Sequence, residues 1–230
     1  MKRENIAGML PFYLLATLIF VGAAAWFSKT VTTTAQQTAV EREATIVIDA
    51  GHGGIDGGAT SCTGVLESAI NLQIALRLND LLHFLGYDTV MIRTTDTSVY
   101  TQGTTIAAQK VSDLKERVRI VNETKRAILI SIHQNTFQGS KTNGAQVFYA
   151  PTAGSRELAQ ILQSKLYPNR SCKSAGSIYL LQNINAPGVL IECGFLSNPE
   201  EESKLRTASY QQYLCCVISS CLREIIHANG

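Results

Sequence analysis

Residues 46–60 read IVIDAGHGGIDGGAT, and this stretch decides the fold. A short β-branched run bounded by glycines predicts a buried strand over residues 45–49. The glycines that follow permit left-handed backbone angles and close approach of a ligand at His52. A histidine at the end of such a strand is placed to bind a metal or transfer a proton; the alternative is a solvated histidine in a glycine loop. The stretch lacks GxGxxG and GxxxxGK[ST], which argues against a nucleotide site.

Strand and helix patterns alternate along the rest of the chain. An amphipathic helix is expected to start at Glu67, and a second is expected to bury Leu114. A third helix should begin near Ser155. One long final helix should follow, with Asn198 as its N-terminal cap. The predicted strands cover residues 45–49, 89–93, 127–133, 145–150, 177–181 and 188–193. This alternation predicts a single α/β domain with about six strands, mostly parallel, and helices on both faces. The links 133–144 and 182–187 are too short for crossovers, so a mixed sheet is expected.

The amino-terminal region differs in character from the rest. Residues 6–26 carry no charge and reach the ~20 apolar residues that a membrane helix needs. Lys2 and Arg3 precede them, which favours a cytoplasmic segment over residues 1–5 and an exported remainder. We therefore predict a transmembrane anchor at 6–26, a linker at 27–43, and one domain at 44–230 outside the cytoplasm. Cleavage as a signal peptide, giving a secreted form, is the alternative.

Composition narrows the possible partners. The 230 residues are 45% apolar and 17% charged, with a formal net charge of +2, and no basic run is interleaved with aromatics. These values are typical of a globular protein and argue against a nucleic-acid partner. None of the six cysteines forms a CxxC pair, so a thiolate zinc site is not expected; a bridge between Cys62 and Cys172 is left open.

Three further acid or imidazole groups stand beside predicted strand ends or helix starts: Glu67, His133 and Glu192. In an open α/β sheet, functional groups gather outside the carboxyl ends of the strands. Two imidazoles and one carboxylate are a sufficient ligand set for catalytic zinc, which keeps a position for water. We therefore predict His52, Glu67 and His133 as ligands of one Zn²⁺, with Glu192 off the metal as the general acid/base.

Each of these residues also fits a structural role when taken singly. Glu67 could have no role beyond stabilising the start of a helix, and His133 could be a hydrogen-bonded histidine of the core. Glu192 ends a hydrophobic strand, where an unpaired carboxylate is costly, so a paired or functional role is favoured.

Four motifs in order carry a family resemblance: DAGHGGIDGGA, GVLESAINL with Glu67, SIHQN with His133, and VLIECGFLSNPEE with Glu192. They resemble the zinc-dependent N-acetylmuramoyl-L-alanine amidases over about residues 46–226. The resemblance implies zinc binding by His52, Glu67 and His133, and catalysis by Glu192. It implies cleavage of the amide between N-acetylmuramic acid and L-alanine in peptidoglycan.

Within that family the likeness is greatest to spore-associated enzymes of cortex maturation, which implies a role in germination and in muramic-δ-lactam formation. It also implies an activating lipoprotein partner, with the chain monomeric or partner-bound. Two alternatives remain at this stage. One is an exported zinc peptidase, and the other is a non-catalytic peptidoglycan-binding module with a structural metal.

Overall fold

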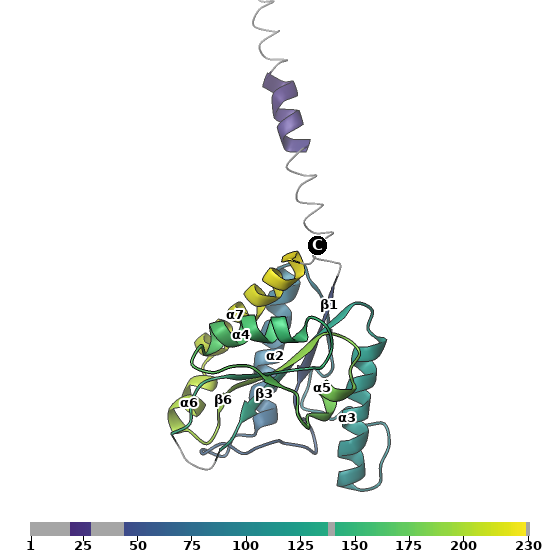
Figure 1. Cartoon of the computed structure of the whole chain (residues 1–230), viewed down its shortest axis with the longest axis vertical. Helices are drawn as coiled ribbons and strands as arrows, with labels where there is room; N and C mark the ends of the chain where they lie inside the picture. Colours follow the sequence, from purple (N-terminus) through teal and green to yellow (C-terminus); the bar gives the residue numbers. More distant parts are fainter. Residues whose placement is uncertain (1–18, 29–43, 138–140, 229–230) are drawn as a thin grey trace, which may run out of the picture. The chain divides into compact units, whose positions relative to one another are not determined.

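The computed structural model of the chain describes residues 19–28, 44–137 and 141–228. Residues 19–28 form a helix with exposed side chains, drawn in purple in Figure 1. Within the described residues, no helix is both long and apolar enough to cross a bilayer. Most of the predicted span 6–26 and nearly all of the predicted linker 27–43 lie outside the described residues, so both stay predictions.

A six-stranded mixed sheet organises residues 44–228, as predicted. The strand order is β2-β1-β3-β6-β4-β5. The bounds are β1 Thr45–Ala50, β2 Asp88–Met91, β3 Ala127–Asn135, β4 Gln146–Tyr149, β5 Lys173–Ser174 and β6 Gly188–Phe195. All neighbouring strands run parallel except β4 and β6, which are antiparallel. The reversal at β4 follows from the short link after β3, which leaves no room for a crossover helix.

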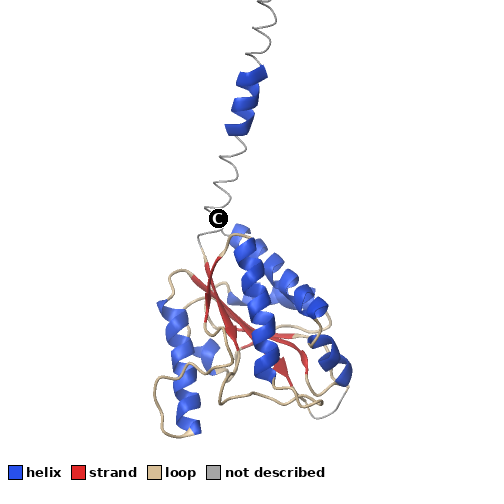
Figure 2. Cartoon of the chain, turned by 180° about the vertical axis from the view of Figure 1, so that it is seen from behind, coloured by secondary structure: helices blue, strands red, loops and turns tan. Residues whose placement is uncertain are grey.

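Helices cover both faces of the sheet (Figures 1 and 2). The helices are α2 Glu67–Phe84, α3 Ile106–Glu123, α4 Ser155–Leu166, α5 Tyr179–Asn183, α6 Pro199–Leu205 and α7 Ala208–Ala228. Alternate residues of β1 pack into the hydrophobic cores on the two faces of the sheet, because successive strand residues point to opposite faces. Ile46 and Ile48 pack in the core under α2, α4 and α7, whereas Val47 packs in the core under α3 and α5.

The connections create a topological switch point at β1. The chain leaves β1 through α2 to β2 on one side, and then reaches β3 on the other side of β1 through α3. β1 and β3 are therefore neighbours in the sheet, but the connections that leave their carboxyl ends lie on opposite sides of their shared boundary. Such a point is where open α/β sheets bind ligands. His52 lies in the loop after β1, and His133 lies near the carboxyl end of β3.

Two elements differ from the prediction. The predicted strand at 177–181 is wrong, because this segment forms the short helix α5 and the sixth strand is the two-residue β5. Leu181 and Ile184 are three residues apart and both are buried in the core beneath α3, so helical spacing serves burial better than extended spacing.

The predicted single final helix is also wrong, because it divides into α6 and α7. The side-chain oxygen of Thr207 accepts a hydrogen bond from the Tyr210 amide at 3.3 Å, and so caps α7 as a separate helix. The predicted cap at Asn198 is confirmed, since its side chain accepts from the amides of Glu200 and Glu201.

Candidate metal centre

His52 follows β1 in the glycine-rich turn. Its backbone has a φ of 61°, a left-handed conformation that residues other than glycine rarely adopt. The side chain is 26% exposed, with Nε2 3.2 Å from Oε2 of Glu67. On the opposite edge of the ring, Nδ1 lies 2.8 Å from Oδ2 of Asp56. One ring nitrogen therefore faces the interior carboxylate, while the other is held by the loop itself.

Glu67 is the first residue of α2, and its side chain is only 4% exposed. Its carboxylate accepts hydrogen bonds from the amides of Ala59 at 3.0 Å and Gln134 at 3.1 Å, and from the side chain of Asn71 at 3.2 Å. Burial alone would raise the pKa of Glu67, but hydrogen bonds and charges from His133 and His52 outweigh it and hold the pKa far below its usual range. The carboxylate is therefore fixed and ionised, and its role exceeds stabilising a helix start.

His133 lies near the end of β3, with Nδ1 2.9 Å from Oε1 of Glu67. Its ring occupies the space in front of Gly51, where an added Cβ would come within 2.2 Å of two ring atoms. Gly58 has the same function for the other two residues, because a Cβ there would lie 2.6 Å from Glu67 and 2.7 Å from His52. Gly51 and Gly58 must therefore lack a side chain, because any Cβ would collide with the three residues of the cluster.

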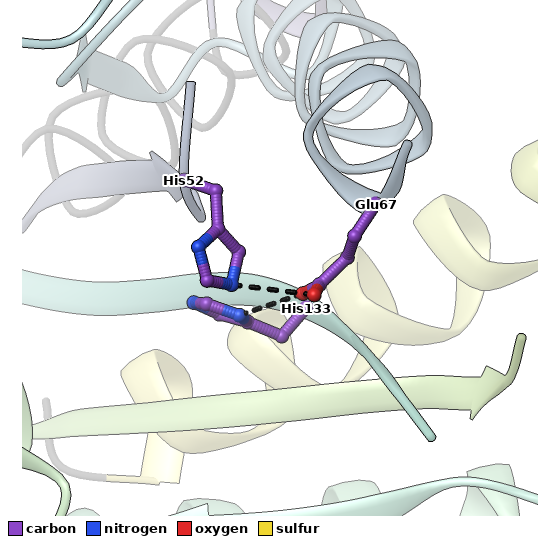
Figure 3. A group of neighbouring side chains, drawn as sticks. All are labelled: His52, Glu67 and His133. Atoms are coloured by element: carbon purple, nitrogen blue, oxygen red, sulfur yellow. Dashed lines mark hydrogen bonds and ion pairs between the residues drawn. The ribbon is translucent and has the colours of Figure 1, made fainter. Parts of the chain in front are cut away.

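The three side chains converge from the β1 loop, α2 and β3, as Figure 3 shows. Their ligand atoms lie within 4.8 Å of one another, and the two imidazole rings are 4.9 Å apart at an angle of 74°. A tetrahedral zinc ion bonded at about 2 Å places its ligand atoms about 3.3 Å apart. The measured contacts of Glu67 with the two histidines, 3.2 and 2.9 Å, are close to that value. The cluster could therefore hold a metal ion.

Glu192 lies on β6 directly opposite His133, on the same face of the sheet. Its Oε2 is buried and has no hydrogen-bond partner among the described residues. Burial raises the pKa of Glu192 to about 7; the charge of Glu67 adds to the rise, and the two histidines oppose it. A carboxyl group that titrates near neutrality beside the cluster is suited to accepting and returning a proton.

Asp56 was not singled out by the sequence argument, although it lies inside the quoted stretch. Besides His52, its carboxylate bonds Nζ of Lys110 at 2.8 Å. Burial alone would raise the pKa of Asp56, but Lys110 and His52 lower it to about 2. Burial lowers the pKa of His52, yet Glu67 and Asp56 raise it to about 9. The same negative charges favour any cation at this position, including a metal ion.

Two buried arginines hold the backbone that carries His52. Arg93 donates to the carbonyls of Ala50 at 2.7 Å and Gly51 at 3.0 Å. Arg117 donates to the carbonyl of His52 at 2.7 Å and to Asp49 within β1. Burial would raise the pKa of Asp49, but Arg117 foremost keeps it below its ordinary value.

The position of Arg117 explains a wrong prediction about α3. Leu114 was expected to face the core but is 39% exposed, whereas Arg117 is 2% exposed. The buried carboxylate of Asp49 needs a cation, because an unpaired buried charge is costly. An aspartate within an apolar strand was the signal that could have identified this pairing.

A pocket of about 320 Å³ opens beside the cluster, and we call it the α3 pocket. Its walls include His52, Ile55, Leu114, His133, Tyr179 and Leu190. The pocket gives a substrate access to both histidines from the side of the sheet that α3 and α5 cover.

Comparisons with known proteins identify the family of the chain. The family of N-acetylmuramoyl-L-alanine amidases matches residues 46–223. The germination-specific N-acetylmuramoyl-L-alanine amidase of Bacillus subtilis is 39% identical over 173 residues, which are 72% of this chain and 73% of that protein.

Two solved structures from clostridia are also similar. The CwlD amidase from Clostridioides difficile, solved in complex with the GerS lipoprotein, has a TM-score of 0.77 and 36% identity, covering 80% of this chain and 99% of that one. An N-acetylmuramoyl-L-alanine amidase from Clostridium difficile 630 has a TM-score of 0.70 and 34% identity, covering 81% and 98%. The chain belongs to the N-acetylmuramoyl-L-alanine amidase family, and is therefore an enzyme that hydrolyses an amide bond of peptidoglycan.

Proposed function

We propose that this amidase depends on zinc, held by Nε2 of His52, Nδ1 of His133 and the carboxylate of Glu67. The observation that carries the proposal is the convergence of these three groups from separate elements within 4.8 Å. Two nitrogens and one oxygen are the donor set of catalytic zinc sites with three protein ligands. Asp56 accepts a hydrogen bond from Nδ1 on the opposite edge of His52, and metal-bound histidines usually donate their second ring N–H to a carboxylate in this way.

We assign the acid/base role to Glu192. A zinc ion held by His52, Glu67 and His133 would polarise the scissile carbonyl and would make a water molecule acidic enough to lose a proton near neutral pH. Glu192 accepts that proton as the water oxygen bonds the lactyl carbonyl carbon, and then delivers it to the nitrogen of L-alanine as the amide bond breaks. The products are the muramic acid carboxylate and a peptide with a free amino end.

The first experiment compares the full-length protein with Glu192→Gln. The variant should retain zinc and lose on the order of 10²–10⁴ in rate, the range expected for a lost general base. Mass analysis of muropeptides with and without chelator measures the reaction, and metal analysis measures the zinc. His52→Ala is the matched variant, which should lose zinc as well as activity. Full activity of Glu192→Gln, or of chelated wild type, would contradict the assignment.

We also propose that the substrate is spore-cortex peptidoglycan and that a lipoprotein binds this chain. The support is the identity to the germination-specific amidase of Bacillus subtilis and the likeness to a clostridial amidase solved with the GerS lipoprotein. A deletion strain should form spores whose cortex lacks muramic-δ-lactam and which fail to germinate. Normal cortex composition in that strain would contradict the spore role.

We further propose that residues 6–26 anchor the chain in the cell membrane, with residues 44–230 outside the cytoplasm. The support is the uncharged apolar run behind Lys2 and Arg3. Protease treatment of intact protoplasts should degrade the domain. A protected domain would contradict this placement.

A further inference from the structure

A second groove lies over the outer strands β4 and β5, apart from the α3 pocket. It has a volume of about 600 Å³, and we call it the β4–β5 groove. Its walls include Asn135, Phe137, Phe148, Arg170, Lys173 and Phe195. Among the described residues that line it there are two cations and no acidic side chain. The groove is therefore positively charged, with aromatic walls.

Strand register places the groove on the same face of the sheet as the metal cluster. Gln146 and Phe148 of β4 lie opposite Glu192 and Leu190 of β6, and residues in register point to the same face. Leu190 lines the α3 pocket, whereas Phe148 lines the groove. The α3 pocket and the groove therefore share one face of the sheet, and Gln146, which lies opposite Glu192, lines the groove.

The groove is within reach of a short peptide that starts at the cluster. Lys173 pairs with Phe148, so it lies two strands away from β6 and two residues back from Glu192. Two strand spacings of ~4.8 Å and a two-residue rise of ~6.7 Å give a separation of ~12 Å between the backbones. An extended chain covers ~3.4 Å per residue, so about four residues span that distance.

The two cations are available to a ligand in different ways. Arg170 is held by hydrogen bonds to the carbonyls of Gly144 at 3.1 Å and Asn143 at 2.8 Å, and its guanidinium lies 5.3 Å from the ring of Phe195. These contacts fix its position without neutralising its charge. Lys173 is exposed and makes no ion pair with any residue that the structure describes.

We propose that the β4–β5 groove binds the carboxylates of the stem peptide of the substrate, an inference that depends on the proposed function. The scissile amide joins an uncharged sugar to a peptide through the amino end of the peptide. The carboxylates of the substrate are therefore all on the peptide side of the bond. A groove with two cations and no acid complements that side, and Arg170 and Lys173 set the direction in which the substrate lies across Glu192.

The test compares Lys173→Glu with Lys125→Glu in the full-length zinc-loaded protein. Lys125 is also exposed, but it lies just before the amino end of the central strand β3, whereas His133 lies near the carboxyl end of that strand. Both variants replace a lysine with a glutamate, so they have the same net charge. The substrates are an N-acetylmuramoyl tetrapeptide with free carboxylates and the same compound with every carboxylate converted to a carboxamide. Lys173→Glu should raise KM for the free acid about three- to tenfold, and leave KM for the carboxamide within twofold. Lys125→Glu should change neither.

The outcomes separate the inference from the function on which it depends. If wild type hydrolyses both compounds and Lys173→Glu behaves like Lys125→Glu, the groove does not bind the peptide carboxylates. An equal rise in KM for both compounds has the same meaning, because charge is then irrelevant. If wild type hydrolyses neither compound, the proposed function fails first, and the inference falls with it. Both variants change exposed side chains, so circular dichroism should show unaltered folds.

Discussion

Replacing Asp56 with asparagine tests whether the loop that carries His52 is built to bind a cation. Asp56 accepts from Nδ1 of His52 at 2.8 Å, and so orients Nε2 toward Glu67. Asparagine keeps the shape of the side chain but removes its charge. We expect the variant to fold normally and to bind zinc more weakly.

The magnitude follows from the geometry. An ion bonded to Nε2 at about 2 Å would lie roughly 6 Å from the carboxylate of Asp56. The −1 charge of the carboxylate and the +2 charge of the zinc ion attract each other at that distance by ~1.4 kcal/mol under full aqueous screening. Lys110 opposes part of this attraction, whereas the partial burial of Asp56, whose side chain is 29% exposed, strengthens it. We therefore expect zinc affinity to fall about tenfold in Asp56→Asn, and up to about 100-fold in Asp56→Ala.

Competitive titration against a chromophoric chelator measures these dissociation constants. Asp88→Asn is the matched control, because Asp88 is exposed at the amino end of β2, whereas His52 follows the carboxyl end of the neighbouring strand β1. It should leave the zinc dissociation constant unchanged. A dissociation constant for Asp56→Asn within twofold of wild type would show that the charge of Asp56 does not support zinc binding at His52.

Two further predictions concern the buried charges. Arg117→Gln leaves the buried carboxylate of Asp49 without its arginine partner, so it should lower the free energy of unfolding, measured in urea, by about 3–5 kcal/mol. Arg119→Gln, on the exposed face of α3, should leave the free energy of unfolding unchanged. Equal effects of the two variants would contradict the argument. The value of kcat/KM should fall about tenfold per pH unit below the pKa of Glu192, because a general base must be ionised. Burial raises that pKa to about 7 in the metal-free protein, and a bound cation lowers it. A profile that is flat down to pH 4 would exclude this role.

The elements that sequence predicts well are those with a strong local pattern. The apolar runs of β3 and β6 and the 3.6-residue period of α2 each match the structure closely. The failures occur where the pattern is short or ambiguous. The apolar residues around Leu181 suit a strand or a helix, and the core beneath α3 selects the helix. The break at Thr207 depends on one hydroxyl group.

The proposed metal site shows the same division. Sequence alone singles out His52, Glu67, His133 and Glu192, because ionisable groups beside strand ends and helix starts are chemically conspicuous. The structure brings the first three together and places Glu192 opposite His133. It does not reveal Arg117, whose place on a helix looks like that of the exposed Arg119 nearby. Nor does it show that Asp56 faces His52 rather than solvent.

What the sequence determined by itself was the class of fold and the residue types available for chemistry, since both depend on patterns a few residues long. Tertiary structure alone decided which ring nitrogen of each histidine faces Glu67, which arginines support the loop that carries His52, and where a second groove opens over β4 and β5. The physical reason is distance along the chain. These contacts join residues 15 to 66 positions apart, or depend on the register of neighbouring strands, and only packing of the whole sheet fixes them.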